Sequence, residues 1–264
     1  MPGPPTFPAL LGLEHRHVLI TGAGGGIGRA LVAAFAAAGA HVSGADRDAA
    51  AMAGLDLYQS LAFDLTDAAA TAAAMARLVD SDAMPDVLVS NAGFTRAETL
   101  DQLDASAFAH ELAVNLAGAY HVAAPVVAAM ARRGHGALVF VASVNGLAHY
   151  GNPAYAAAKA GLIALAKALA VERGSMGLRV NVVCPGSVRT PAWDHRLARE
   201  PGLIARVLPH YPLGRLVTPE EVASAVLFLA SPAASGITGA VLTVDAGLTA
   251  GNYRFIADVL GGGG

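Results

Sequence analysis

A glycine-rich turn between a strand-like and a helix-like segment constrains the fold more than any other part of this chain. The apolar run His17–Thr21 predicts a buried strand, and the alanine-rich residues 29–38 predict a helix. The connecting sequence is TGAGGGIG, with spaced glycines at Gly22, Gly26 and Gly28. Glycines let a backbone turn tightly and approach a ligand, and a helix N-terminus attracts a pyrophosphate. The sequence therefore predicts a dinucleotide site at this turn.

Strand-like and helix-like segments alternate along the rest of the chain. Short apolar runs predict further strands at residues 41–46, 59–63, 85–89, 137–142, 178–183 and 241–244. Helical patterns occupy residues 68–79, 100–130 and 153–173. No linker-like stretch separates them, so we expect one α/β domain over residues 1–264: a Rossmann-type, doubly wound parallel sheet of about seven strands with helices on both faces. Its ends are expected to be an irregular N-terminal arm (1–14) and a disordered tail (261–264).

Composition and charge narrow the class of protein. Hydrophobic residues make up 55% of the chain and charged residues 14%, which favours a compact globule over a disordered chain. The net charge of −3 includes no basic run, so neither nucleic acid nor an anionic membrane is an expected partner. The single cysteine, Cys184, suits a reducing cytoplasm. No apolar run approaches transmembrane length, the N-terminus lacks the pattern of a signal peptide, and no metal-type His/Cys cluster is evident. We therefore expect a cytoplasmic protein without a metal site.

Tyr155 and Lys159 are the leading catalytic candidates. Four residues apart on a predicted helix, their side chains leave the same face. An ammonium beside a phenol favours the phenolate and is expected to lower the phenol pKa, which suits proton transfer. Ser143 follows the predicted buried strand 137–142, and ligands of open α/β sheets bind at the carboxyl ends of strands. The alternative is an exposed helical Tyr–Lys pair without function.

Asp46 is the candidate for cofactor choice. It ends the second predicted strand, where a carboxylate can accept both ribose hydroxyls of an adenosine and repel a 2′-phosphate. Gly25 leaves the glycine turn without a basic residue, which also favours NAD over NADP. Arg47 is able to hold that phosphate and leaves NADP open. Asp46 can equally be a helix N-cap.

Three further polar positions each allow a functional and a structural interpretation. Asp64 can meet the adenine amino group or cap the next helix. The turn Asn91-Ala92-Gly93 after the fourth strand can line the cofactor site or be only a turn. Asn115 lies in an apolar helix, where it can hold a water near the site or satisfy a neighbouring backbone group.

Taken together, these motifs resemble the short-chain dehydrogenase/reductase family, in its single-domain branch. The resemblance covers most of residues 17–247. It rests on an ordered set of segments: TGAGGGIG (21–28), Asp46, DLTD (64–67), NAG (91–93), Asn115, Ser143, YAAAK (155–159), CPGSVRT (184–190) and ITGAVLTVDAG (237–247). Each segment is a weak signal by itself, but their order and spacing together are specific.

The resemblance implies roles for the matching positions. Tyr155 would be the acid/base, Lys159 would bind the nicotinamide ribose and lower the phenol pKa, Ser143 would bind the substrate oxygen, and Asn115 would hold a water that links Lys159 to solvent. It also implies a cofactor site made of Gly22, Gly24, Gly26, Ile27, Gly28, Asp46, Arg47, Asp64, Leu65, Asn91, Ala92, Gly93, Tyr155, Lys159, Pro185, Gly186, Val188 and Thr190.

In this family the segment corresponding to residues 190–215 covers the substrate. Here it holds Trp193, Asp194, His195, Arg196, Arg206, His210 and Tyr211. Polar groups mixed with aromatic ones suit a hydroxylated ring or chain; the alternative is a tryptophan that only packs and charges that face water. The expected substrate contacts are Asn145, His149, Tyr150, Trp193 and His195.

We therefore expect an NAD-dependent oxidoreductase that interconverts a secondary alcohol and a ketone, with a sugar, polyol or cyclic alcohol as substrate. An NADPH-dependent ketoreductase of the 3-oxoacyl type is the alternative, with an entrance made basic by Arg96, Arg196 and Arg206. A non-catalytic NAD-binding protein is a further alternative. The resemblance also implies a homotetramer, and the small-residue-rich helices within 118–130 and 156–170 allow close packing across a two-fold axis.

Overall fold

A single sheet of seven parallel strands forms the centre of the molecule. The computed structural model describes residues 11–96 and 99–261, and the strand order in it is β3-β2-β1-β4-β5-β6-β7. The strands are β1 (His17–Thr21), β2 (His41–Asp46), β3 (Gln59–Ala62), β4 (Val87–Ser90), β5 (Gly136–Val141), β6 (Leu178–Pro185) and β7 (Val241–Val244). The prediction of a doubly wound domain with about seven parallel strands is confirmed.

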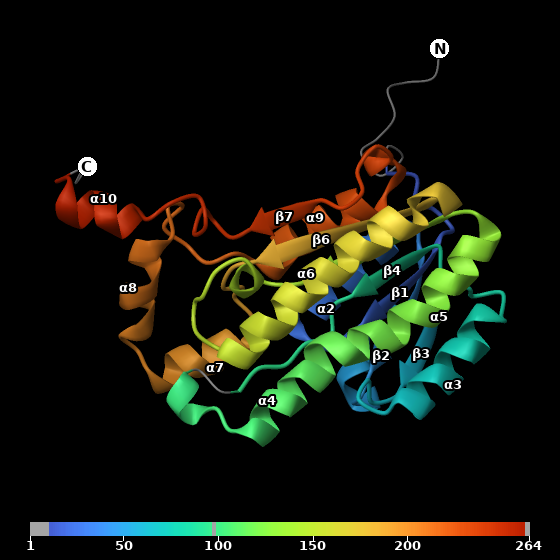
Figure 1. Cartoon of the computed structure of the whole chain (residues 1–264), viewed down its shortest axis with the longest axis horizontal. Helices are drawn as coiled ribbons and strands as arrows, with labels where there is room; N and C mark the ends of the chain where they lie inside the picture. The colour runs from blue at the N-terminus through green and yellow to red at the C-terminus, as the bar shows by residue number, and fades with distance from the viewer. Residues whose placement is uncertain (1–10, 97–98, 262–264) are drawn as a thin grey trace, which may run out of the picture.

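Helices cover both faces of this sheet. One face is covered by α2 (Gly26–Ala37) and α9 (Pro219–Ala230), which also pack on each other. The other is covered by α3 (Ala68–Val79), α5 (Gly118–Arg133) and α6 (Pro153–Arg173), and α4 (Ala105–Leu112) packs on α6. Figure 1 shows α5 and α6 in front of the sheet and α2 behind it. Successive side chains of β1 point to opposite faces of the sheet and so contribute to two hydrophobic cores. Val18 and Ile20 lie in the core with α2 and α9, and Leu19 lies in the core on the other face.

The strand order places a binding crevice at the carboxyl ends of β1 and β4. Strands β2 and β3 lie on one side of β1, and the chain then crosses to β4 on the other side. Helices that follow neighbouring strands on opposite sides leave a crevice between them, where open α/β sheets bind ligands. Thr21 and Ser90 end these two strands opposite each other.

The long helix predicted over residues 100–130 is interrupted in the structure. The region expected to be helical over 100–130 contains the 3-10 turn η2 (Leu100–Gln102), then α4, a π-helical turn η3 (Ala113–Ala117), and α5. Residues 97 and 98 lie outside the described part. Between β2 and β3 there is only the short 3-10 segment η1 (Ala49–Met52).

The structure adds to the expected N-terminal arm. Residues 1–10 lie outside the described part of the chain, but Leu11 and Leu13 are buried in the core with α2 and α9. The apolar end of the predicted arm is thus part of the core, because two leucines gain more by burial than by exposure. Of the predicted tail only Gly261 is described.

Two helical stretches, 105–133 and 153–176, are long and apolar enough to cross a membrane by length and composition. The expectation that no apolar stretch approaches that length does not hold for them. Both pack against the sheet, where α5 and α6 contribute their inner residues to one hydrophobic core. Core helices of this kind pass such a test, so the finding is weak evidence for a membrane.

Candidate active site

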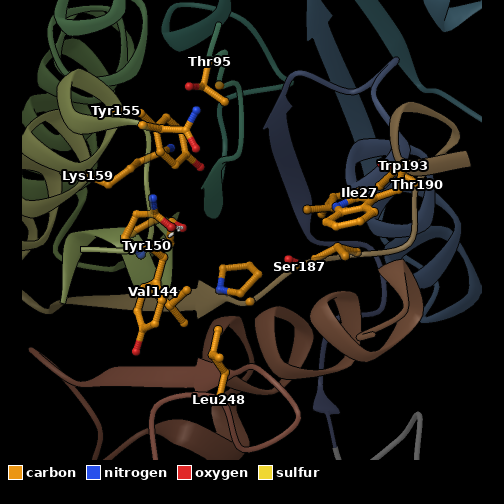
Figure 2. Close-up of a pocket in the computed structure, with 18 of the residues that line it drawn as sticks. Ile27, Thr95, Val144, Tyr150, Tyr155, Lys159, Ser187, Thr190, Trp193 and Leu248 are labelled. Atoms are coloured by element: carbon orange, nitrogen blue, oxygen red, sulfur yellow. Dashed lines mark hydrogen bonds between the residues drawn. The ribbon is translucent and has the colours of Figure 1, made fainter. Parts of the chain in front are cut away.

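Ser143, Tyr155 and Lys159 meet at the carboxyl end of β5. Ser143 follows this strand, and α6 presents Tyr155 and Lys159 from successive turns (Figure 2). The Lys159 side chain is only 2% exposed; its Nζ donates to the Val141 carbonyl at 3.0 Å and lies 5.4 Å from the Tyr155 ring centroid. The Ser143 hydroxyl hydrogen-bonds to the Tyr155 phenol. The structure thus brings the three expected residues together instead of leaving an exposed helical pair.

Burial controls the proton affinities of this group. It raises the pKa of the Tyr155 phenol to about 12, against the lowering effect of the Ser143 hydrogen bond. It also lowers the pKa of Lys159 to about 8. The expectation that the ammonium lowers the phenol pKa is therefore not met in the protein alone, because burial disfavours the charged forms of both groups. A positive charge brought into the pocket would shift the balance towards the phenolate.

Asn115 holds the loop that follows β4. Its side chain is fully buried; Oδ1 accepts from the Phe94 amide at 3.0 Å, and Nδ2 donates to the carbonyls of Phe94 at 2.6 Å and Glu111 at 2.9 Å. These contacts fit the structural alternative for this amide, a side chain that satisfies backbone groups. Asn115 lies inside the π-helical turn η3, a local irregularity that often occurs at functional sites.

Glu111 is a site residue that the sequence analysis missed. Its side chain is 1% exposed, and Oε1 accepts from the Arg96 amide at 2.8 Å and from the Thr95 hydroxyl at 3.4 Å. Its charge also contributes to the raised pKa of Tyr155, after burial and the Cys184 thiol. Glu111 and Asn115, one helical turn apart, thus fasten one loop whose Phe94 and Thr95 line the pocket. The sequence shows only a glutamate in a helical pattern, which gives no signal that its side chain is buried.

A cleft of about 550 Å³ lies beside the glycine turn and fits a dinucleotide. Gly22 has φ of +64°, and a Cβ at Gly28 would lie 2.0 Å from the Gly22 carbonyl oxygen, so neither position accepts a side chain without strain. Helix α2 begins at Gly26 with no side-chain cap and no acidic residue in its first turn. Its amides are thus available to a pyrophosphate. Of the expected cofactor residues, those lining this cleft are Gly22, Gly26, Ile27, Gly28, Asp46, Arg47, Asp64, Leu65, Asn91, Ala92, Gly93 and Thr190.

Polar side chains that line this cleft also form hydrogen bonds to the backbone around it. Asp46 accepts from the amides of Gly24 at 3.0 Å and Asp48 at 3.2 Å; Gly24 itself lies outside the lining and contributes through this bond. Asn91 Nδ2 donates to the carbonyls of Thr21 and Gly22, each at 3.1 Å. Asn91 thus links the turn after β4 to the turn after β1.

Asp64 is engaged locally. It accepts from the Thr66 amide at 2.8 Å and the Thr66 hydroxyl at 2.7 Å, and these bonds hold its pKa below the usual range. The following helix is capped by Asp67, which accepts from the Ala70 amide at 2.9 Å. The helix cap that was an alternative for Asp64 is thus Asp67, and Asp64 lines the cleft.

A second, larger cavity of about 720 Å³ adjoins the cleft and holds the Ser143–Tyr155–Lys159 group. Pro185, Gly186 and Val188, which end or follow β6, line it as expected. Ile27, Asn91, Gly93 and Thr190 line both spaces. A long ligand can therefore run from the glycine turn to Tyr155.

The segment 190–215 forms a helical lid over this cavity. It contains α7 (Pro191–Arg199), α8 (Leu203–Val207) and the 3-10 turn η6 (Leu208–His210). Trp193 lines the cavity and also packs on the core, so both interpretations of this tryptophan apply (Figure 2). Asn145 and Tyr150 line the cavity from the segment after β5.

His149 and His195, two of the five expected substrate contacts, are not among the lining residues and are exposed. Along α7, position 195 is two residues after Trp193 and points to another side of the helix, whereas Arg196, three residues after it, shares the Trp193 face. Arg196, Arg206 and His210 line the cavity from the lid.

Comparisons with known proteins agree with this site. A family model described as Enoyl-(Acyl carrier protein) reductase matches residues 22–249. A Schizosaccharomyces pombe protein named Uncharacterized oxidoreductase C922.06 is 43% identical over 249 residues, 94% of this chain and 96% of that protein. Galactitol 2-dehydrogenase (L-tagatose-forming) of Cereibacter sphaeroides is 38% identical, covering 90% of this chain and 96% of that enzyme.

Among solved structures, an oxidoreductase of the short-chain dehydrogenase/reductase family from Burkholderia thailandensis superposes with a TM-score of 0.87 and 46% identity. The match covers 95% of this chain and 98% of that one. From the parallel sheet, the glycine turn and these matches together, we conclude that the chain belongs to the short-chain dehydrogenase/reductase family of oxidoreductases.

Proposed function

We propose that this protein is an NAD-dependent alcohol dehydrogenase acting on a polar, hydroxylated secondary alcohol. The observation that carries the proposal is the position of Ser143, Tyr155 and Lys159 in a cavity that opens into a dinucleotide-sized cleft. A fold alone has no need of that group at that junction, which argues against a non-catalytic NAD-binding protein.

Each residue of the group has a distinct part in the proposed reaction. Tyr155 takes the hydroxyl proton of the alcohol as the carbinol C–H bond breaks and the C=O bond forms. Ser143 holds the same oxygen against the phenol. Lys159 donates one hydrogen to the Val141 carbonyl, and its other hydrogens would hold the ribose of a bound cofactor. Asn115 holds the loop at Phe94 in place beside this group through its side-chain hydrogen bonds. NAD, when bound, would supply the hydride acceptor and the positive charge of its oxidised nicotinamide ring.

We propose that the cofactor is NAD and not NADP because of the position of Asp46. Its carboxylate lines the cleft at the carboxyl end of β2, where it favours ribose hydroxyls and opposes a phosphate. Arg47 lines the same cleft and is the residue that would support NADP.

Polar side chains in the second cavity support a hydroxylated substrate. Asn145, Tyr150 and Asn152 offer amide and hydroxyl groups to several substrate oxygens. The dehydrogenase from Cereibacter sphaeroides named above acts on galactitol by its name. The alternative is a 3-oxoacyl ketoreductase, which is supported by a relative from Vibrio harveyi named 3-oxoacyl-[acyl-carrier-protein] reductase FabG, 36% identical over 90% of this chain.

We propose that the enzyme works as a homotetramer in the cytoplasm. A groove of about 600 Å³ along α5 and α6 is lined mainly by apolar residues, among them Tyr120, Val127 and Leu169, and also by Arg132 and Arg173; Tyr120 is 53% exposed. Apolar surface of this kind on two long helices suits an interface between copies of the chain. Sedimentation of the purified protein tests the assembly.

Replacement of the proposed acid/base tests the function. We expect Tyr155→Phe to lower kcat by at least about 100-fold, because a positioned acid/base contributes about 10²–10⁴. NADH binding, followed by its fluorescence, should persist. Tyr58→Phe, at an exposed tyrosine that lines neither the cleft nor the cavity, is the matched control and should be fully active. A Tyr155→Phe enzyme with normal turnover of any alcohol would sink this mechanism.

Replacement of the proposed selector tests the cofactor. Asp46→Asn keeps an acceptor for the Gly24 and Asp48 amides but removes the charge. We expect the ratio of kcat/KM with NAD to that with NADP to fall about tenfold or more, since like charges in contact cost several kcal/mol. Asp48→Asn, which retains the neighbouring turn, serves as the control. An unchanged ratio in Asp46→Asn would mean that another residue sets the preference.

A further inference from the structure

Tyr211 is a buried tyrosine in the wall of the substrate cavity. It caps the end of the turn η6 within the lid, and it is only 5% exposed. It lines the same cavity as Ser143 and Tyr155. The proposed reaction gives it no part, although a buried polar group normally has hydrogen-bond partners for all that it can donate or accept.

The Tyr211 hydroxyl group accepts a hydrogen bond but donates none within the described part of the chain. Its oxygen accepts from the Ser187 amide at 3.1 Å. A phenol also has one hydrogen to donate, and no residue in the ranges 11–96 and 99–261 accepts it. A buried donor without an acceptor is unfavourable, so the acceptor for this hydrogen has to come from a molecule inside the cavity.

The backbone and the core hold this tyrosine in place. Its amide donates to the Leu208 carbonyl at 2.9 Å, and its carbonyl accepts from the Gly214 amide at 2.8 Å. The Leu213 amide donates to the Ala246 carbonyl at 3.1 Å, which joins the end of the lid to the loop after β7. The Tyr211 ring packs into the core with α2 and α9. A donor fixed in this way loses little freedom when a ligand binds to it.

The Tyr211 hydroxyl and the reacting group lie on different sides of the cavity. The ring of Tyr211 lies beside Gly186, where an added Cβ would be 3.4 Å from the ring atom Cε1, and the hydroxyl meets Ser187. Both neighbours line the cavity after β6, and Figure 2 shows Ser187 across the open centre from Tyr155. A substrate whose reacting oxygen is at Tyr155 therefore meets Tyr211 with another part of the molecule.

We propose that Tyr211 donates a hydrogen bond to a second oxygen of the substrate, so that the enzyme selects diols and polyols over alcohols with a single hydroxyl group. The inference rests on the proposed dehydrogenase function and names a residue that determines its specificity. The Ser187 amide occupies a lone pair of the phenol oxygen and polarises the hydroxyl, which makes it a better donor. The hydride of the reacting carbinol goes to NAD and its hydroxyl proton to Tyr155, while the second hydroxyl group stays intact.

Matched alcohols test the second oxygen separately from the carbon skeleton. Cyclohexanol is compared with the three positional isomers of cyclohexanediol, and butan-2-ol with butane-2,3-diol, all with NAD and the full-length enzyme. We expect kcat/KM for at least one diol to exceed that for its monohydric partner about tenfold or more, the effect of one hydrogen bond to a buried donor. The most favoured isomer reports the separation of the two oxygens. If no diol exceeds its partner, the inference is wrong.

Removal of one oxygen atom identifies the binding residue. Tyr211→Phe keeps the ring, and the ratio of kcat/KM for the favoured diol to that for its monohydric partner should fall about tenfold, mainly through a higher KM for the diol. Tyr58→Phe, at an exposed tyrosine outside the cavity lining, is the matched control and should keep the wild-type ratio. An equal loss for diol and partner in Tyr211→Phe would mean that the hydroxyl only holds the Ser187 amide, and would overturn the proposal.

Two results separate this inference from the proposed function. Turnover of monohydric alcohols and diols at the same kcat/KM would leave the dehydrogenase standing and overturn the role of Tyr211. A preference for a 3-oxoacyl thioester that Tyr211→Phe loses would overturn the diol as substrate together with the proposed function. If no alcohol is oxidised, binding decides: a diol should raise the unfolding temperature of the NAD-loaded wild type and of Tyr58→Phe more than its monohydric partner does, and Tyr211→Phe should lose that difference. No difference in the wild type would overturn the inference.

Discussion

Arg179 makes side-chain contacts from which the loss of stability on replacement can be worked out. It lies on β6, and its two terminal nitrogens donate to five carbonyls at the end of α9 and in the segment after it: Leu229 at 2.8 Å, Ala230 at 3.1 Å, Ser231 at 3.0 Å, Ala234 at 3.0 Å and Ile237 at 3.4 Å. The last turn of a helix leaves four carbonyls without partners, and a cation there also meets the negative end of the helix dipole. Arg179 therefore joins the sheet to α9.

We expect Arg179→Met to destabilise the protein strongly. Counted as two charged donors instead of five separate bonds, the loss is about 3–6 kcal/mol, at about 1.5–3 kcal/mol for each. With a shift of about 2–4 °C per kcal/mol for a chain of this size, the melting temperature should fall by roughly 6–24 °C. Arg179→Lys keeps the charge without the fork and should fall in between.

Guanidinium denaturation followed by circular dichroism measures the change in the free energy of unfolding, and a thermal melt measures the change in melting temperature. Arg77→Met is the matched control, because Arg77 is exposed in the last turn of α3, and it should change stability by no more than about 0.5 kcal/mol. If Arg179→Met melts within about 2 °C of the wild type, the five short contacts do not carry the energy assigned to them.

Two further predictions concern charge. Glu111→Gln keeps an acceptor for the Arg96 amide but removes a negative charge that helps to raise the pKa of Tyr155. The acid limb of the pH profile of kcat/KM should therefore move to lower pH, whereas Glu172→Gln, at an exposed glutamate, should leave the profile unchanged. An unchanged profile in Glu111→Gln would contradict the electrostatic link between Glu111 and Tyr155. Burial lowers the pKa of His17 below its unfolded value of 6.5, and the charge of His41 adds to this effect. Because the folded state then binds fewer protons than the unfolded state, the protein loses stability as the pH falls below about 6.5. In denaturation series from pH 8 to 5, His17→Gln should lose less stability than the wild type, and parallel curves would refute this.

The parts of the site that depend on local order in the chain were predictable. Tyr155 and Lys159 occupy one helix face by spacing alone, and Ser143 follows an apolar strand, so the sheet brings the three together. The same holds for the glycine turn, where a strand, three spaced glycines and a helix leave little choice of structure.

The parts that depend on burial or on contacts across the chain were not predictable. A glutamate looks the same in the sequence whether it faces water or, like Glu111, accepts the Arg96 amide from a loop fifteen residues earlier. The direction of the Tyr155 pKa depends on how deeply the pair is buried, which spacing does not report. In the short lid helix, one step of helical phase decides that Arg196 lines the cavity and His195 does not.

The all-parallel sheet has a consequence for how the chain is made. Every strand pair joins segments separated by a crossover: Val18 of the central strand pairs with Val87, and no strand can pair with the next by a tight hairpin. Long loops must close before those contacts form, which slows folding. During synthesis, β1 can pair with β2 but lacks its other neighbour until β4 is made, and β6 keeps an unpaired edge until β7 is made near the end of the chain. Truncation before residue 241 would therefore expose an unpaired edge beside the active site.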